Sequence, residues 1–171
     1  MADLQIRRYE PGDEDAVWDL HERALRDVGA YDEAYAHLDA DLRAVESEYL
    51  DAGGEFLVGE VERRDASGTD SGLVAMGAIK PSPDVDHHES DPDTVVVRRM
   101  RVDPEQQRRG FGSAILGELE TRAADLGFDR LVLDTTPDQM SAIALYESFG
   151  YSEVRRESTP AGERIVFEKH L

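Results

Sequence analysis

The chain has 171 residues, the size of one domain, and it can bury a core without disulfides or metals. It contains no cysteine, which excludes disulfides, thiolate nucleophiles and thiolate metal ligands. Its 38 acidic and 19 basic residues give a formal net charge of −19, which disfavours binding to nucleic acid and to anionic membranes. We therefore expect a single domain, residues 1–171, with neither of these partners.

Charge and hydropathy also suggest where the protein works. Lys80 and Lys169 are the only lysines, and a lysine-poor, acidic surface is typical of proteins from salt-loving microbes. A surface built for a cationic partner is the alternative explanation. No apolar stretch approaches the length that spans a membrane, and the first ten residues contain no apolar signal core. We expect a soluble, cytoplasmic protein.

The first half of the chain predicts two helices and three strands. Alternation over 4–9 indicates a strand, and Pro11-Gly12 ends it. Asp13 can cap the following helix, whose apolar face comprises Ala16, Val17, Leu20 and Ala24, with Trp18 expected in the core. A second amphipathic helix is predicted over 38–50. The rest reads as strands over 56–61 and 72–80, a polar turn over 63–71 and a loop over 81–93.

The second half has clearer signals. Strands are predicted over 94–102 and 130–135, and helices over 112–126 and 138–150. Gly127 is expected to end the first of these helices. A final hairpin pairs 151–157 with 164–169 around a turn at 160–162. The resulting order, β-α-α-β-β-β-α-β-α-β-β, predicts a mixed α/β fold.

Two glycines stand where a strand gives way to a helix. Gly110 and Gly112 allow a turn that leaves backbone N–H groups at the positive end of the helix, an arrangement suited to phosphate. Arg108 and Arg109 could add charge-assisted contacts. A P-loop lysine is missing, and Ile115 replaces the third glycine of a dinucleotide fingerprint. Taken alone, the G-x-G pair is equally consistent with a tight, well-packed turn.

Three linked motifs carry a more specific signal. They are V-x-P-x-x-Q-R-R-G-x-G over 102–112, LGFDRLVLDT over 126–135 and AIALYESFGY over 142–151. Together they resemble the GNAT superfamily of N-acetyltransferases over about a third of the chain. The resemblance implies a GNAT-type, mostly antiparallel sheet with splayed central strands, flanked by helices. It also implies acetyl-CoA as the cofactor and a small-molecule or peptide amine as the acceptor.

The resemblance assigns cofactor contacts residue by residue. The strand over 97–102 splays from the strand over 130–135, so that the pantetheine arm pairs with backbone groups of Met100, Arg101 and Val102. The pyrophosphate lies in a cradle formed by Gln107, Arg108, Arg109, Gly110, Phe111, Gly112 and Ser113. Ala142 and Tyr146 complete the set on the last helix, together with Gln139. Gln139 stands where many members of the family have asparagine; it either reaches the same acceptor or loses that contact.

The chemistry implied by the resemblance is direct acetyl transfer. Tyr146 corresponds to the tyrosine that protonates the departing thiolate, and a packing role beside Leu145 and Phe149 is the alternative. The central strand lacks the glutamate that often serves as base. Asp134, Glu55 and Glu60 are candidates, and none is assigned. A non-catalytic acyl-CoA-binding sensor is the alternative function.

Other polar and aromatic residues carry weaker signals. His87-His88-Glu89 could suggest a metal, but adjacent histidines point apart and no third ligand is spaced for zinc; a solvated loop and no metal are expected. Tyr31 and Tyr35 fall in a segment that lines the acceptor site in GNAT proteins, or they belong to a loop that packs on itself. A homodimer is one assembly that the sequence leaves open.

Overall fold

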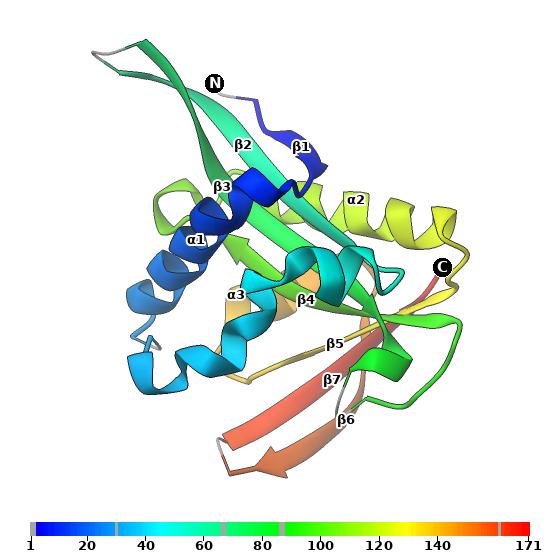
Figure 1. The fold of residues 1–171 in the computed structure, drawn as a ribbon. Coiled ribbons are helices and arrows are strands. Elements are labelled where there is room, and N and C mark those ends of the chain that lie inside the picture. Colours follow the sequence, from blue (N-terminus) through cyan, green and yellow to red (C-terminus); the bar gives the residue numbers. More distant parts are fainter. Residues whose placement is uncertain (1–2, 30, 66–67, 86–87, 161) are drawn as a thin grey trace.

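The structure is a computed structural model that describes residues 3–29, 31–65, 68–85, 88–160 and 162–171. Three α-helices and seven strands form its framework (Figure 1). The strands are β1 (Gln5–Arg8), β2 (Glu55–Asp65), β3 (Gly68–Pro81), β4 (Thr94–Val102), β5 (Arg130–Thr135), β6 (Ser152–Thr159) and β7 (Gly162–His170). The helices are α1 (Glu14–Asp27), α2 (Phe111–Asp125) and α3 (Met140–Ser148). Short turns of other helix types are η1 (Pro11–Asp13), η2 (Glu33–Arg43), η3 (Glu46–Leu50), η4 (Ser82–Asp84) and η5 (Pro104–Gln106).

All seven strands belong to one sheet, in the order β1-β2-β3-β4-β5-β7-β6. Every pairing is antiparallel except that of β4 with β5, which is parallel. This parallel pairing covers only Thr94–Val96 against Arg130–Val132. The predicted fold class, a mixed and mostly antiparallel sheet flanked by helices, is therefore confirmed.

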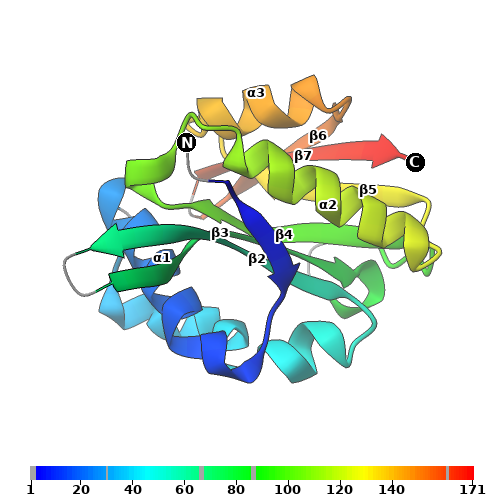
Figure 2. The same cartoon turned by 90° about the horizontal axis from the view of Figure 1, so that it is seen from above.

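One face of the sheet, here called the α2 face, is covered by α2 and α3 (Figure 2). Its core joins side chains of the strands to Phe111, Ile115, Leu116, Leu119 and Tyr146 on these helices. The apolar spacing predicted for 112–126 is thus the buried stripe of α2. Gly127 follows the helix at φ 92°, in the left-handed region expected of a helix-ending glycine.

The opposite face, here called the α1 face, is covered by α1 and by η2 and η3 (Figure 2). Its core includes Val17 and Leu20 from α1, Tyr49 from η3, and Met76 and Ala78 from β3. The predicted apolar face of α1 is only partly correct, because Ala16 is exposed and His21 is buried instead. Trp18 packs against this core as expected.

The helix predicted over 38–50 is wrong. This part of the chain forms a 3₁₀ segment, η2, with non-helical backbone angles at Asp39, and then a π-helical turn, η3. Asp39 and Asp41 both bind Arg99, and residues two apart in an α-helix point to opposite sides. The polar contacts to β4 therefore favour a different local backbone from the one that the apolar spacing favours.

Several predicted boundaries also differ. The polar turn over 63–71 is wrong, because β2 and β3 pair through Asp65↔Gly68, with 66–67 outside the described residues. Ladder hydrogen bonds come from the backbone, so polar side chains do not stop them. The Asp13 side chain accepts from the N–H of Glu10 and from Arg7, and makes no cap bond to α1. Within the loop over 81–93, Ser82–Asp84 forms a short 3₁₀ turn.

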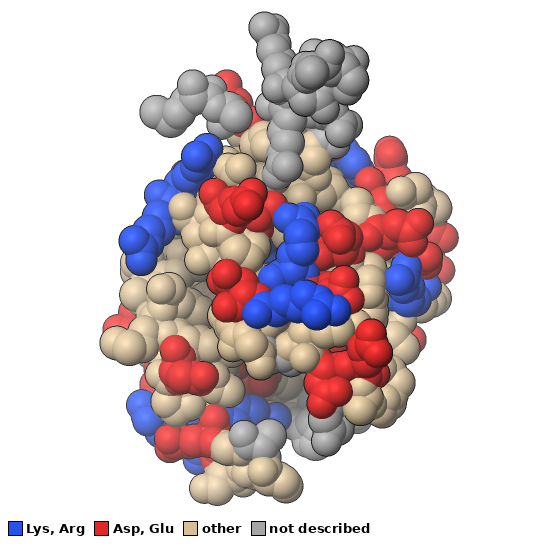
Figure 3. Space-filling view, turned by 90° about the vertical axis from the view of Figure 1, so that its left-hand side faces the viewer, with Lys and Arg blue, Asp and Glu red and all other residues tan. Residues whose placement is uncertain are grey.

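Acidic side chains are spread over the face drawn in Figure 3, and several of the basic ones lie against them. Among the described residues, no helix is both long and apolar enough to cross a membrane.

Candidate functional site

The centre of the sheet opens where β4 and β5 part. The two strands pair only as far as Val96 and Val132, and from Val97 to Val102 the β5-facing edge of β4 has no strand partner among the described residues. The backbone edge of β4 therefore faces a V-shaped opening, as the resemblance to the GNAT superfamily implied. An extended, amide-containing ligand can pair with such an edge as an additional strand would.

The loop from β4 to α2 has the backbone shape of an anion cradle. Arg108 and Gly110 both have positive φ, 66° and 80°, and Gly110 precedes the first residue of α2. The N–H groups of Arg109 and Gly110 make no hydrogen bond within the described part of the chain. The first turn of α2 adds further N–H groups at its positive end. Successive N–H groups in such a loop form a concave site for phosphate oxygens.

The side chains of this loop contribute unequally. Gln107, Arg108 and Arg109 are exposed, and so is Ser113 at the start of α2. Phe111 is 7% exposed and belongs to the α2-face core, so only its backbone is available to a ligand. A Cβ on Gly112 would meet its nearest neighbours at 3.5 Å and 3.7 Å, which is ordinary contact. At Gly112 the protein itself therefore tolerates a methyl group, and a larger side chain would fill the cradle.

The three predicted residues of β4 point to different faces. The side chains of Met100 and Val102 pack against the α2-face core. Arg101 lies opposite Met76, a residue of the α1-face core, so its side chain is on the α1 face. Its Nη1 donates to the carbonyl of Met100 at 2.9 Å, while its Nε is buried without a hydrogen-bond partner. Burial lowers the pKa of Arg101, with the charge of Arg99 adding to the effect.

Helix α3 supplies the remaining predicted residues. Gln139 is the N-cap residue, and its side-chain amide donates to Thr136 Oγ1 at 3.2 Å. This local bond occupies one amide hydrogen and leaves the side chain exposed. Ala142 is half-buried and packs against the α2-face core. Ala142 and Tyr146 are one helical turn apart and so share a side of α3.

Tyr146 is buried but its hydroxyl is unused. The residue is 7% exposed, and its ring packs edge-on against Tyr151 at a centroid distance of 5.9 Å. The hydroxyl makes no hydrogen bond to any described residue. Burial raises the pKa of Tyr146 to about 12, the nearby charge of Arg101 opposes this shift, and Asp134 adds to it. The phenol therefore stays protonated at neutral pH with a free O–H donor.

Two of the three candidate bases are already engaged in ion pairs. Glu55 is 1% exposed and binds Arg8, with Arg122 at 3.5 Å. Glu60 binds Arg7 at 3.1 Å. Asp134 differs, because it lies on β5 two residues beyond the last pair with β4. It alternates with Leu131 and Leu133 of the α2-face core, so it faces the α1 side of the opening.

Asp134 has a histidine partner from the loop between β3 and β4. His88 Nε2 lies 2.8 Å from Asp134 Oδ1, and the His88 side chain is 4% exposed. Burial disfavours the Asp134 carboxylate, but the hydrogen bond and charge of His88 outweigh it, and the pKa of Asp134 falls below its usual value. The solvated loop expected at 87–89 is therefore wrong for His88, and His87 lies outside the described residues.

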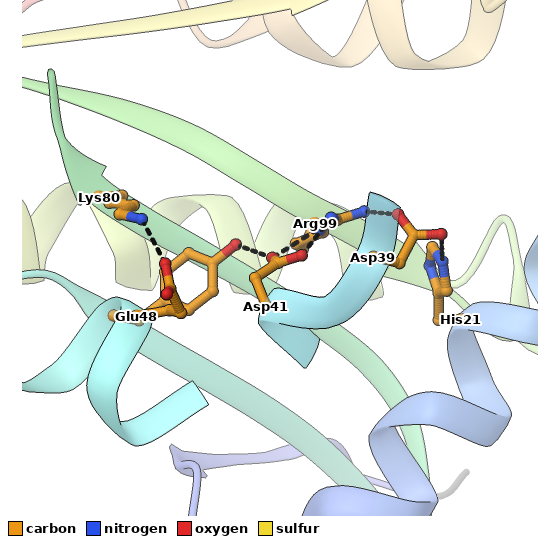
Figure 4. Close-up of polar contacts among 7 residues, drawn as sticks. His21, Asp39, Asp41, Glu48, Lys80 and Arg99 are labelled. Carbon is orange, nitrogen blue, oxygen red and sulfur yellow. Dashed lines mark hydrogen bonds and ion pairs between the residues drawn. The ribbon is translucent and has the colours of Figure 1, made fainter. Parts of the chain in front are cut away.

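A second polar network connects the α1 side of the molecule to β4 (Figure 4). Arg99, at φ 58°, donates to Asp39 at 2.8 Å and to Asp41 at 2.6 Å. His21 lies 3.0 Å from Asp39, and the Tyr49 hydroxyl donates to Asp41. Lys80 pairs with Glu48 at 2.9 Å beside this network. The network fixes η2 against the strand that borders the opening.

Several of these residues were not predicted as part of the site. His88 was expected only in a solvated loop, because adjacent histidines point apart and no third zinc ligand is suitably spaced, and its partner Asp134 is 46 residues away. Within the motif-bearing strand, Arg98 and Arg99 were read only as strand positions. The sequence did contain a signal, because β4 is half-buried and carries three arginines. Buried guanidinium groups need a carboxylate partner or a ligand.

The structure describes two further features that bear on the weaker sequence signals. Tyr31 lies under Arg26, with the guanidinium 4.3 Å from its ring centre, and the Tyr35 side chain lies outside the described part. Among the described residues, no group of three or more potential metal ligands comes together.

The fold, the V-shaped opening and the anion cradle together describe an acyltransferase of the GNAT type. Residues 15–151 match the Acetyltransferase (GNAT) family, which is most of the chain, and the chain belongs to this family. N-acetyltransferase family 8 member 2 of Rattus norvegicus is 28% identical over 129 residues, which are 75% of this chain and 52% of that protein. The ribosomal protein bS18-alanine N-acetyltransferase of Escherichia coli K12 is 37% identical over 70 residues, 40% of this chain and 47% of that protein.

A solved acetyltransferase structure from Salmonella typhimurium, with its cofactor acetyl-CoA, is similar in fold. It has a TM-score of 0.72 and 18% identity, covering 98% of this chain and 94% of that chain. The chain spans about half the length of the curated relatives described above.

Proposed function

We propose that residues 1–171 form one acetyltransferase domain that moves an acetyl group from acetyl-CoA to an amine. The observation that carries the proposal is the opening between β4 and β5, with an unpaired edge of β4 and with Tyr146 within electrostatic reach of Arg101 on β4 and Asp134 on β5. An N-acetyltransferase activity is also in the names of the rat and Escherichia coli relatives. When bound, acetyl-CoA supplies the thioester and a thiolate leaving group.

The residues present fit this cofactor. Backbone groups of Met100–Val102 are available to the pantetheine arm, because that edge of β4 has no strand partner among the described residues. The N–H groups around Gly110 suit the pyrophosphate, and the exposed side chains of Arg108 and Arg109 can approach its negative charge. Gln139 and Ala142 on α3 are the further contacts that the resemblance to the GNAT superfamily implies.

We assign the proton donor to Tyr146. A phenol with a pKa near 12 remains protonated through the working pH range and can donate to sulfur as the thioester breaks. Desolvation also makes a departing thiolate more basic, which reduces the mismatch between the two groups. Arg101 lies close enough to oppose the burial effect on Tyr146, so its charge also favours the developing thiolate.

We assign the base to the His88–Asp134 pair. If Nε2–H of His88 donates to Asp134, the lone pair on Nδ1 is available for a proton from the acceptor amine. The negative charge of Asp134 stabilises the imidazolium that forms, and Arg98 and Arg164 limit this effect. One proton thus leaves the amine and another reaches the sulfur, so the enzyme needs no covalent intermediate.

The composition supports a proposal about the cell compartment and the salt conditions in which the protein works. We propose a cytoplasmic enzyme of a salt-adapted cell, because the chain has no cysteine and carries a formal charge of −19.

The experiment combines binding and turnover. Acetyl-CoA at 100 times its dissociation constant should stabilise the native protein by about 2.7 kcal/mol, read as a rise in Tm, and Gly112→Asp should abolish the rise. Free thiol release should then be followed with a panel of amines. Stabilisation without turnover of any amine would favour the alternative function, a non-catalytic acyl-CoA sensor. Stabilisation by ATP or NAD but not by CoA would overturn the proposal.

A further inference from the structure

The α1 side of the opening holds more positive charge than the chain's composition suggests. Arg98 lies opposite Ala78, and Arg101 opposite Met76, and both of these β3 residues belong to the α1-face core. Directly opposite residues of antiparallel strands share a face, so both arginines point to the α1 side. They flank Arg99, which occupies a bulge where the β3–β4 register shifts.

These arginines differ in how they are neutralised. Arg99 is held by Asp39 and Asp41, the only ion pairs that the described part of the chain gives to any of the three. Neither Arg98 nor Arg101 has a carboxylate within ion-pair distance among the described residues. The chain has two acidic residues for each basic one, so carboxylates that could pair with these arginines are plentiful in the sequence. Leaving two half-buried guanidinium groups without a carboxylate costs stability unless something else binds them.

The nearby carboxylates act on these two arginines only at a distance, because each is held by other groups. Asp134 is bound by His88, Asp41 by Arg99 and Tyr49, and Asp39 by Arg99 and His21. Nor is the cofactor cradle a natural partner, because it lies at the start of α2, whose side chains pack on the opposite face of the sheet. The two arginines therefore face the side of the opening from which the acceptor, not the cofactor, would approach.

We propose that the acceptor amine carries a carboxylate, which Arg98 and Arg101 bind on the α1 face. The substrate class is then an amino acid or a small compound resembling one, and this inference rests on the proposed function. A guanidinium offers two parallel N–H donors that match a carboxylate. Arg101 influences Tyr146 electrostatically, so the carboxylate and the reacting amine would be only a few bonds apart. The proposal adds a negative group to the cationic partner that the net charge raised as an alternative.

The test compares acceptors that differ only in this charge. Phenylalanine, phenylalaninamide and phenethylamine, with matched sets for alanine and glutamate, should be assayed by thiol release. We expect kcat/KM to be at least about tenfold higher for the best amino acid than for its amide. Arg98→Gln and Arg101→Gln should remove this preference, and Arg98→Lys should restore part of it. Arg156→Gln, a surface arginine on the edge strand β6, should leave it unchanged.

A second readout does not depend on turnover. With CoA present, isothermal titration calorimetry should show N-acetyl amino acids binding at least about tenfold more tightly than their amides, and the two glutamine variants should abolish the difference. The CoA-induced rise in Tm, retained in both variants, shows that they fold and bind cofactor. Equal binding of acids and amides, or a preference that survives both substitutions, would overturn the proposal. Turnover of amines and amides but not of acids would overturn it while leaving the proposed function intact. Binding that depends on the carboxylate, without turnover of any acceptor, would overturn the proposed function and leave the carboxylate-binding site intact.

Discussion

Tyr146 has the two properties that a proton donor to sulfur needs. Its ring is held by packing against Tyr151, and its hydroxyl makes no hydrogen bond to the described residues. The Tyr151 hydroxyl is buried without a hydrogen-bond partner, whereas the Tyr146 hydroxyl is not one of these fully buried unpaired atoms. An O–H that is not sealed in the core can meet a bound thioester, which favours the catalytic role over the packing role.

Tyr146→Phe separates these roles. The ring stays, so Tm and CoA affinity should change little, whereas kcat should fall by about 10²- to 10⁴-fold because the proton donor is lost. Stopped-flow or steady-state assays of thiol release measure the loss. Acyl donors with a more acidic leaving thiol should show a smaller effect. Full activity in the variant would remove Tyr146 from the mechanism, and loss of CoA binding would show that its role is packing.

The His88–Asp134 pair predicts a loss of turnover when either partner is changed. His88→Gln removes the proposed proton acceptor and should lower kcat by about 10²-fold or more, measured by thiol release. Asp134→Asn should lower kcat as well, because the charge that stabilises the imidazolium formed in the reaction is gone.

Other groups near this pair set the control for that experiment. Arg98, Arg164 and Tyr146 all lie within electrostatic reach of Asp134, so CoA affinity should be measured in both variants to show that the cofactor site is intact. An unchanged kcat in His88→Gln would contradict the assignment of the base.

At the scale of elements, η2 depends on Arg99 for its position. The Arg99 side chain is 10% exposed, and its two carboxylate partners are 22% and 12% exposed. Burial opposes ionisation of Asp39, but the His21 hydrogen bond and the charge of Arg99 outweigh it, and its pKa falls to about 2. The charges of β4 thereby hold in place a segment that has no α-helical backbone of its own.

Arg99→Gln should destabilise the protein by up to about 3 kcal/mol, because two half-buried carboxylates lose their cation. Asp39 has a lower pKa in the folded state than its ordinary 3.8, so its contribution is present above pH 4 and is lost as the pH falls toward 2. Urea unfolding between pH 5 and pH 2 should show a weaker acid dependence in the variant. Arg156→Gln, whose ion pair is exposed, should cost less than about 1 kcal/mol. A loss in Arg99→Gln no larger than that of this control would contradict the role of Arg99.

The elements also show what the sequence could and could not reveal. β4 and β5 have the predicted bounds, since their β-branched runs are buried by helices that the same sequence predicts. The helix predicted over 38–50 was wrong because the long-range contacts of Asp39 and Asp41 to Arg99 outweigh the local apolar spacing. The residues assigned to the cofactor follow one another along one sequence motif, so the sequence could predict them. On the acceptor side, His88 and Asp134 come from distant parts of the chain, so no sequence spacing predicts their contact.

At the scale of the whole molecule, the net charge determines how the stability of the fold should depend on salt. A formal charge of −19 implies self-repulsion that salt should relieve, since the Debye length falls from about 10 Å at 0.1 M to about 3 Å at 1 M. Tm measured by calorimetry should therefore rise with KCl well beyond physiological strength. A Tm that stays flat from about 0.1 to 2 M would contradict salt adaptation.

The short pairing between β4 and β5 has a mechanical consequence. Only three residue pairs join the part of the sheet formed by β1–β4 to the part formed by β5–β7. The two parts of the sheet are thus joined by a short stretch of ladder, and a molecule bound in the opening would contact both parts and hold them together. Hydrogen–deuterium exchange should reveal this as slower exchange of amides over 97–102 and in β5 when CoA is present. Because the α2-face core still joins the two parts of the sheet, the cofactor would tighten this junction during transfer, and the junction would relax when the product leaves.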